Sequence, residues 1–154
     1  MSSFTIAEDP LDSPEVLELL RLHLEEMHAA SPACKVHAMS PERLREDDVT
    51  FYAVRDGDRL AAVGALKALG DDIGELKSMR ASPEFRGKGA GRALLEHLIA
   101  QGQARGYRWL GLETGRTVEF EAARRLYERY GFRECEAFNG YTSDEFSLCM
   151  ERDL

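Results

Sequence analysis

The chain has 154 residues, of which 44% are hydrophobic and 31% are charged, and its 28 acidic and 20 basic side chains give a formal net charge of −8. This length predicts one domain over residues 1–154, able to bury a core without metals or disulfides. An acidic chain is a poor candidate for general nucleic-acid binding. The longest apolar runs, such as Leu60–Leu66, are too short to span a bilayer, and the N-terminus lacks a signal-peptide pattern.

Cysteine usage indicates the redox compartment. Cys34, Cys135 and Cys149 form no C-x-x-C pair, and their number is odd. Free thiols are typical of a reducing environment, so we expect a cytoplasmic protein with no contact to membranes.

The first fifty residues predict one strand and two helices. Phe4 and Ile6 alternate with polar neighbours, as in a short strand. Apolar residues then recur at helical spacing, with a proline and an acid in the first turn, so a helix is expected from Ser13 to about Ala30. Ser40-Pro41-Glu42 begins a second, shorter helix that runs to about Arg45.

The remainder predicts strands interrupted by two longer helices. Turn residues Asp56-Gly57-Asp58 join two strands, Thr50–Arg55 and Leu60–Leu69, into a hairpin, and Ile73–Ala81 is expected as the next antiparallel strand. Gly131 is in the position that ends a helix. The later elements are a helix over Gly89–Arg105, a buried strand over Trp109–Thr114, a helix over Glu119–Tyr130, and two strands from Phe132 to near Glu151. This order predicts an α/β (α+β) fold with a mixed, mostly antiparallel sheet of six to seven strands and helices on both faces.

A glycine-rich turn between a strand and a long helix carries the clearest functional signal. It reads Arg86-Gly87-Lys88-Gly89-Ala90-Gly91-Arg92. Glycines let the backbone approach a ligand closely, and the first amides of the following helix attract an anion. Between Arg80 and Arg92 there are four basic residues and one acid, so a chain that is acidic overall contains a local basic site suited to phosphate.

Two known phosphate-binding turns, the P-loop and the dinucleotide-binding turn, fit this segment poorly. A P-loop requires Lys-Ser or Lys-Thr after the glycines, which is absent. A dinucleotide-binding turn requires a small residue where Arg92 or Leu94 stands, although Glu113 follows at the distance of a ribose-binding acid. The turn could also be an ordinary left-handed connection before a helix.

The pattern R-x-x-G-x-G formed by Arg86, Gly89 and Gly91 resembles the pyrophosphate loop of the GNAT superfamily, the Gcn5-related N-acetyltransferases. A second motif, A-x-x-L-Y-x-x-x-G-F from Ala123 to Phe132, follows at the distance found in that superfamily. The resemblance covers about Phe51 to Phe132 and implies a GNAT fold that binds acetyl-CoA as co-substrate, without a metal. It extends to a branch of small bacterial proteins with poorly established acceptors, some of them described as indole-acetate acetyltransferases.

The resemblance also assigns the donor site. The superfamily splays the strand carrying Met79 away from its neighbour, so the Met79 N–H would hold the thioester oxygen, and Arg80 and Ala81 would pair with the pantetheine like an added strand. The loop from Arg86 to Arg92, with Gly87, Lys88, Gly89, Ala90 and Gly91, would bind the pyrophosphate. Phe120 stands where many members place a cofactor-binding asparagine.

Candidate catalytic groups follow from the same resemblance. Tyr127 would be the general acid that protonates the thiol leaving group. Glu75, four residues before Met79, and Glu113, at the end of the next strand, are candidate general bases, and alternation predicts that Glu75 and Met79 share one face of their strand. A water chain could replace either carboxylate.

The acceptor is expected to be an amine of a small molecule or a peptide. His28, His37 and Glu113 are the candidate acceptor-binding residues, whereas His23 and His97 are interpreted as surface or packing residues. Acceptor specificity would come from residues 1–50 and from Phe138–Ser143. We expect direct attack by the amine, in a monomer or homodimer, and the alternatives are a non-catalytic acyl-CoA sensor and a dinucleotide-binding oxidoreductase.

Overall fold

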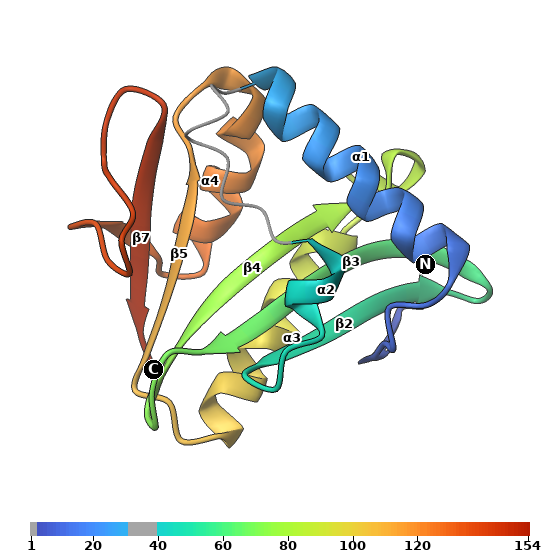
Figure 1. The fold of residues 1–154 in the computed structure, drawn as a ribbon, viewed down its shortest axis with the longest axis horizontal. Coiled ribbons are helices and arrows are strands. Elements are labelled where there is room, and N and C mark those ends of the chain that lie inside the picture. Colours follow the sequence, from blue (N-terminus) through green and yellow to red (C-terminus); the bar gives the residue numbers. More distant parts are fainter. Residues whose placement is uncertain (1–2, 31–39) are drawn as a thin grey trace.

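The computed structural model describes residues 3–30 and 40–154, whose strands form one seven-stranded sheet (Figure 1). The strand order in the sheet is β1-β2-β3-β4-β5-β7-β6. The strands are β1 (Thr5–Glu8), β2 (Val49–Asp56), β3 (Arg59–Ala68), β4 (Ile73–Ala81), β5 (Trp109–Gly115), β6 (Arg133–Cys135) and β7 (Ser147–Asp153).

The helices follow the order that the sequence predicts. The 3₁₀ turn η3 precedes α4, which therefore begins two residues later than expected. The helices are α1 (Pro14–Ala30), α2 (Pro41–Leu44), α3 (Ala90–Ala104) and α4 (Glu121–Arg129), with 3₁₀ turns η2 (Pro83–Phe85) and η3 (Val118–Phe120). The Ser40 hydroxyl accepts a hydrogen bond from the Arg43 N–H and caps α2. The order of helices and strands along the chain is the predicted one, so that prediction is confirmed.

Hydrophobic clusters cover both faces of the sheet. Tyr127 of α4 packs with the α3 residues Leu94 and Leu98 against Leu76 on one face. On the other face, Val16 and Leu20 of α1 pack against residues of β2 and β3. Figure 1 accordingly shows α3 behind the sheet and α2 in front of it, which confirms the predicted arrangement of helices on both faces.

The sheet is divided at its middle. All neighbouring strands are antiparallel except β4 and β5, which pair in parallel only through Ile73 with Trp109, Gly74 with Leu110, and Glu75 with Gly111. Beyond these three pairs the two strands diverge (Figure 1). The carboxyl-terminal part of β4, from Leu76 to Ala81, therefore has no β5 partner.

A β-bulge interrupts β4 in this diverging part. Lys77 pairs with Ala65 and Arg80 pairs with Val63, so Gly64 alone faces two residues of β4. Ser78 has φ 55°, a left-handed conformation that is uncommon for residues other than glycine. Met79 packs with Leu76 on the α3 side, so Glu75 lies on the opposite face and the prediction that Glu75 and Met79 share a face is wrong.

Within residues 3–30 and 40–154, no helix combines the length and the apolar composition needed to cross a membrane.

Candidate active site

A cleft of about 1340 Å³ lies where β4 and β5 diverge, and α1, α3 and α4 contribute to its walls. The structure brings most of the predicted site residues to this cleft. The predicted residues that line it are Glu75, Met79, Arg80, Ala81, Arg86, Gly87, Gly89, Ala90, Gly91, Arg92, Glu113 and Tyr127.

Two predicted residues within the described part of the chain are not among those that line the cleft. Lys88 lies between Gly87 and Gly89 in the glycine loop, and its Nζ is 5.9 Å from the centre of the Phe85 ring. His28 is an exposed residue near the end of α1, although its neighbours Met27 and Ala29 line the cleft. His37 lies outside the described residues.

The glycine loop has the backbone geometry expected of an anion site. Gly87 and Gly89 have φ of 73° and 89°, and Gly89 immediately precedes the 15-residue helix α3. Their positive φ angles favour glycine. A Cβ atom at either position would meet no atom within 4 Å, so the space beside them is open. The positive end of the α3 dipole therefore faces the cleft.

Gly91 differs from Gly87 and Gly89, because its φ is not positive. A Cβ atom there would meet only Leu126 Cδ2, at 3.8 Å, an ordinary contact distance. Nothing in the protein itself excludes a side chain at this position. Phe120, in the place of the expected asparagine, instead packs its ring against the backbone of Gly115.

Tyr127 projects from α4 to the diverging end of β4. Its hydroxyl is 3.9 Å from Met79 Sδ, and its ring packs edge-on against Phe132 with a centroid distance of 5.9 Å. Burial, with a smaller contribution from the charge of Glu113, raises the pKa of Tyr127 to about 12. The hydroxyl therefore stays protonated at neutral pH and can act as a proton donor.

Glu113 lies on β5 across the cleft from β4. Among the described residues its carboxylate has no hydrogen bond or ion pair, and burial raises its pKa to about 7 against the attraction of Lys77. A carboxylate with this pKa can accept a proton at neutral pH and release it again.

Glu75, the other predicted base, is instead held in a polar network. Its side chain is 1% exposed, Asn139 Nδ2 donates to Oε1 at 3.2 Å, and the Tyr141 hydroxyl donates to Oε2 at 2.5 Å. Lys77 Nζ lies 3.4 Å from the same Oε2 and also donates to the Tyr141 hydroxyl. These contacts fix the loop between β6 and β7 to Glu75. A carboxylate that is engaged in this way is a poor candidate for the general base.

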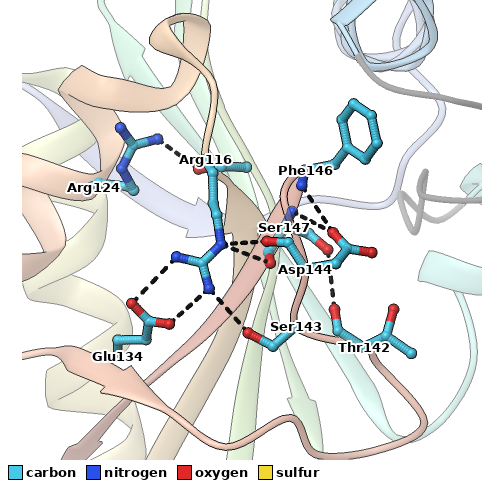
Figure 2. Close-up of polar contacts among 9 residues, drawn as sticks. Arg116, Arg124, Glu134, Thr142, Ser143, Asp144, Phe146 and Ser147 are labelled. Atoms are coloured by element: carbon cyan, nitrogen blue, oxygen red, sulfur yellow. Dashed lines mark hydrogen bonds and ion pairs between the residues drawn. The ribbon is translucent and has the colours of Figure 1, made fainter.

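Arg116 holds the base of the same loop (Figure 2). Its Nε donates to the carbonyl oxygen of Asp144 at 2.5 Å, and its Nη2 donates to Glu134 at 2.7 Å and to Ser143 Oγ at 3.0 Å. Asp144 Oδ1 in turn accepts from the N–H groups of Phe146 and Ser147. The loop that carries Tyr141 into the cleft is therefore fixed at its base and, through Glu75, near its tip.

Helix α1 brings a histidine and a carboxylate to the cleft. Glu26 Oε2 forms ion pairs with Arg80 Nη2 and, at 3.3 Å, with Arg86 Nη2. His23 is 9% exposed, and burial together with the charge of Arg80 lowers its pKa to about 4. The burial of His23 agrees with the packing alternative of its sequence interpretation, but His23 also lines the cleft, which that interpretation does not predict.

Sequence reasoning missed Lys77, Glu26 and the side-chain role of Arg80. Alternation along β4 puts Lys77 on the face of Glu75, which could have indicated their pairing. No local signal connects Tyr141 with Glu75, 66 residues away.

Comparison with known proteins agrees with this geometry. Residues 16–132 match the acetyltransferase (GNAT) family. The chain is 42% identical over 146 residues to YsnE of Bacillus subtilis, an uncharacterised N-acetyltransferase, covering 95% of this chain and 97% of YsnE. It is 41% identical over 157 residues to YedL of Escherichia coli, also an uncharacterised N-acetyltransferase, covering 98% of this chain and 99% of YedL.

A solved structure of similar fold contains a ligand. It is a GNAT family acetyltransferase from Elizabethkingia anophelis with acetyl-CoA bound, which superposes with a TM-score of 0.72 at 19% identity and covers 98% of both chains. This likeness concerns the fold.

Proposed function

Since the chain belongs to the GNAT family and is thus an N-acetyltransferase that uses acetyl-CoA, we propose that it acetylates the amine of a small molecule or a peptide by direct attack on the thioester. The observation that carries the proposal is the edge of β4 from Leu76 to Ala81, which has no strand partner on the β5 side among the described residues and lies between the glycine loop and the two candidate acid-base groups. Such an edge can accept an extended ligand as an added strand.

We propose that the donor lies along this edge. The pyrophosphate would occupy the open space beside Gly87, Gly89 and the first turn of α3, where glycine backbone and helix dipole favour an anion. The pantetheine would pair with Arg80 and Ala81, and the Met79 N–H would donate to the thioester oxygen. The open space beside Gly91 supports this position for the donor.

The proposed reaction begins with removal of a proton from the acceptor ammonium. The Glu113 carboxylate would take this proton, directly or through a water molecule, because its pKa of about 7 allows the ionised form at neutral pH. The amine nitrogen then attacks the carbonyl carbon, and negative charge develops on the oxygen beside the Met79 N–H. When the C–S bond breaks, the electron pair goes to sulfur and Tyr127 donates the proton that makes the free thiol. The second proton that the attacking nitrogen loses then returns to the Tyr127 phenolate, so the products are a neutral amide and the free thiol.

Proton transfer from Tyr127 to sulfur is energetically acceptable. With ordinary pKa values of about 10 for the phenol and 8.5 for the thiol, full transfer in water is uphill by about 2 kcal/mol. Burial that raises the pKa of Tyr127 would also raise the pKa of a thiol bound beside it, since both are neutral acids.

The described cysteines support direct attack over a covalent enzyme intermediate. Burial raises the pKa of Cys149 and raises that of Cys135 to about 11, so neither is a ready thiolate. Neither residue is among those that line the cleft.

The test measures release of the coenzyme A thiol from acetyl-CoA in the presence of amines, amino acids and peptides. We expect release that depends on the acceptor and on an ionised group with a pKa near 7. Binding of coenzyme A without release by any acceptor would contradict the proposal.

A further inference from the structure

The wall of the cleft formed by α1 and β4 contains polar groups without hydrogen-bond partners. Within the part of the chain that the structure describes, His23 Nδ1, Ser78 Oγ and Arg80 Nε are buried and unpaired, and all three residues line the cleft. Burying a polar group without a hydrogen-bond partner is unfavourable. A ligand that offers acceptor oxygens here would remove part of this cost.

The same wall carries an excess of positive charge. Glu26 is a single carboxylate facing two guanidinium groups, those of Arg80 and Arg86. It forms an ion pair with Nη2 of Arg80, yet neither Nη2 nor Nε has a hydrogen-bond partner among the described residues, and the Arg80 side chain is only 16% exposed. His23 is neutral at pH 7, because its pKa is about 4, so it adds no charge but offers one N–H.

The opposite charge lies on β5. Glu75 and Lys77 neutralise each other at 3.4 Å, whereas Glu113 is a cleft carboxylate on β5 without an ion-pair partner among the described residues. The cleft therefore has an acidic group on one side and a surplus guanidinium on the other.

We propose that the acceptor is an amine that also carries a carboxylate, as a free amino acid does, with its carboxylate bound by Arg80 and His23 and its amine directed to Glu113. This inference rests on the proposed function for the identity of the amine, while the carboxylate subsite rests on the α1 and β4 contacts. Arginine suits the role because its planar guanidinium keeps its charge and donates along the Nε edge.

The test compares amino acids with their carboxamides, which keep the amine and lose the negative charge. Each member of both panels is titrated by calorimetry into protein saturated with coenzyme A. We expect at least one amino acid to bind about tenfold or more tightly than its carboxamide, as a charge-assisted hydrogen bond would provide. Equal or tighter binding of every carboxamide would overturn the proposal.

Variants of Arg80 test whether this residue causes the preference for amino acids over their carboxamides. In Arg80→Gln the ratio of acid to carboxamide affinity should fall toward one, and Arg80→Lys should retain part of it. The ratio does not depend on the fraction of folded protein, so partial unfolding of a variant does not imitate the result. A matched control is Arg108→Gln, since Arg108 is an exposed arginine paired with Asp72 away from the cleft.

Two results would contradict the assignment of Arg80. One is an unchanged ratio in Arg80→Gln. The other is loss of coenzyme A affinity without a change in that ratio, which would make Arg80 a donor-binding residue. Amino acids that bind with the predicted preference but release no thiol would contradict the proposed function alone, whereas thiol release without the preference would contradict this inference alone.

Discussion

Glu75 and Met79 lie on opposite faces of β4, because the bulge at Ser78 adds one residue between them. Met79 packs on the α3 side near Tyr127, whereas Glu75 binds Tyr141 and Lys77 on the α1 side. Glu75 is therefore not on the face of β4 that carries Met79, contrary to what the spacing of the two residues in the sequence predicts. The base is expected to come from Glu113 on the neighbouring strand, and Glu75 is expected to hold the loop that carries Tyr141.

Replacement of Glu113 by glutamine is expected to reduce kcat/KM by about 10²-fold at pH 7, the usual contribution of a positioned general base. In the unaltered enzyme, kcat/KM should rise with pH through about 7 as the Glu113 carboxylate ionises. In the variant this dependence should disappear, as a pH–rate profile from pH 5.5 to 9 would show. A variant that keeps both its rate and its profile would identify another base or a water chain.

The same variant has an independent effect on stability. The Glu113 pKa is raised in the folded state, so ionisation of its carboxylate destabilises the fold progressively as pH rises from about 4.5 to about 7. Glu113→Gln lacks this penalty and should gain in the free energy of unfolding relative to the unaltered chain, by at most about 3 kcal/mol, between pH 5 and pH 8. Urea unfolding at the two pH values measures it, and a constant difference would contradict the shift.

Replacement of Tyr127 by phenylalanine is expected to lower kcat by about 10²-fold, because it removes the proton for the departing thiolate. The phenylalanine ring can keep the edge-on contact with Phe132, so the melting temperature should change little. The measurement is thiol release with acetyl-CoA compared with a thioester whose leaving group has a lower pKa. A loss of similar size with both donors would mean that the Tyr127 hydroxyl acts at a step other than protonation of the leaving thiolate.

Removal of the Glu75 carboxylate is expected to destabilise the fold. Glu75→Ala leaves Lys77, which is 11% exposed, buried without its counter-ion, at a cost of about 3 kcal/mol. Replacing Lys77 by methionine in the same chain should restore part of the loss, because no unpaired charge remains. Urea unfolding of the two single variants and the double variant measures the coupling, and additive effects would contradict it.

The glycine loop offers a contrast between two positions. Gly89→Ala should destabilise the fold by about 1–2 kcal/mol, because φ of 89° is unfavourable for alanine. Gly91→Ala should keep or raise stability, since alanine favours a helix and meets only Leu126 at 3.8 Å, yet it should weaken coenzyme A binding. Thermal unfolding and coenzyme A titration of both variants check this, and unchanged affinity in Gly91→Ala would place the pyrophosphate elsewhere.

The sequence predicts the elements well because their signals are local. Proline and an acid begin α1, Ser40 caps α2, and the glycine loop and Gly131 mark the ends of later helices. Ser78 gives no such signal, because a serine with φ of 55° looks like any strand residue in a sequence. The Glu75 network depends on how a loop folds back over the sheet, and the cleft position of His23 depends on how α1 docks against β4; both are tertiary properties.

The three residue pairs between β4 and β5 have a further consequence for the lifetime of the protein. If coenzyme A fills the gap as an added strand, its binding and the completion of the sheet are one thermodynamic event. A donor present at a hundred times its dissociation constant would then add about 2.7 kcal/mol to the free energy of unfolding. A shortage of acetyl-CoA and of free coenzyme A would therefore lower the stability of the folded enzyme as well as the supply of its substrate.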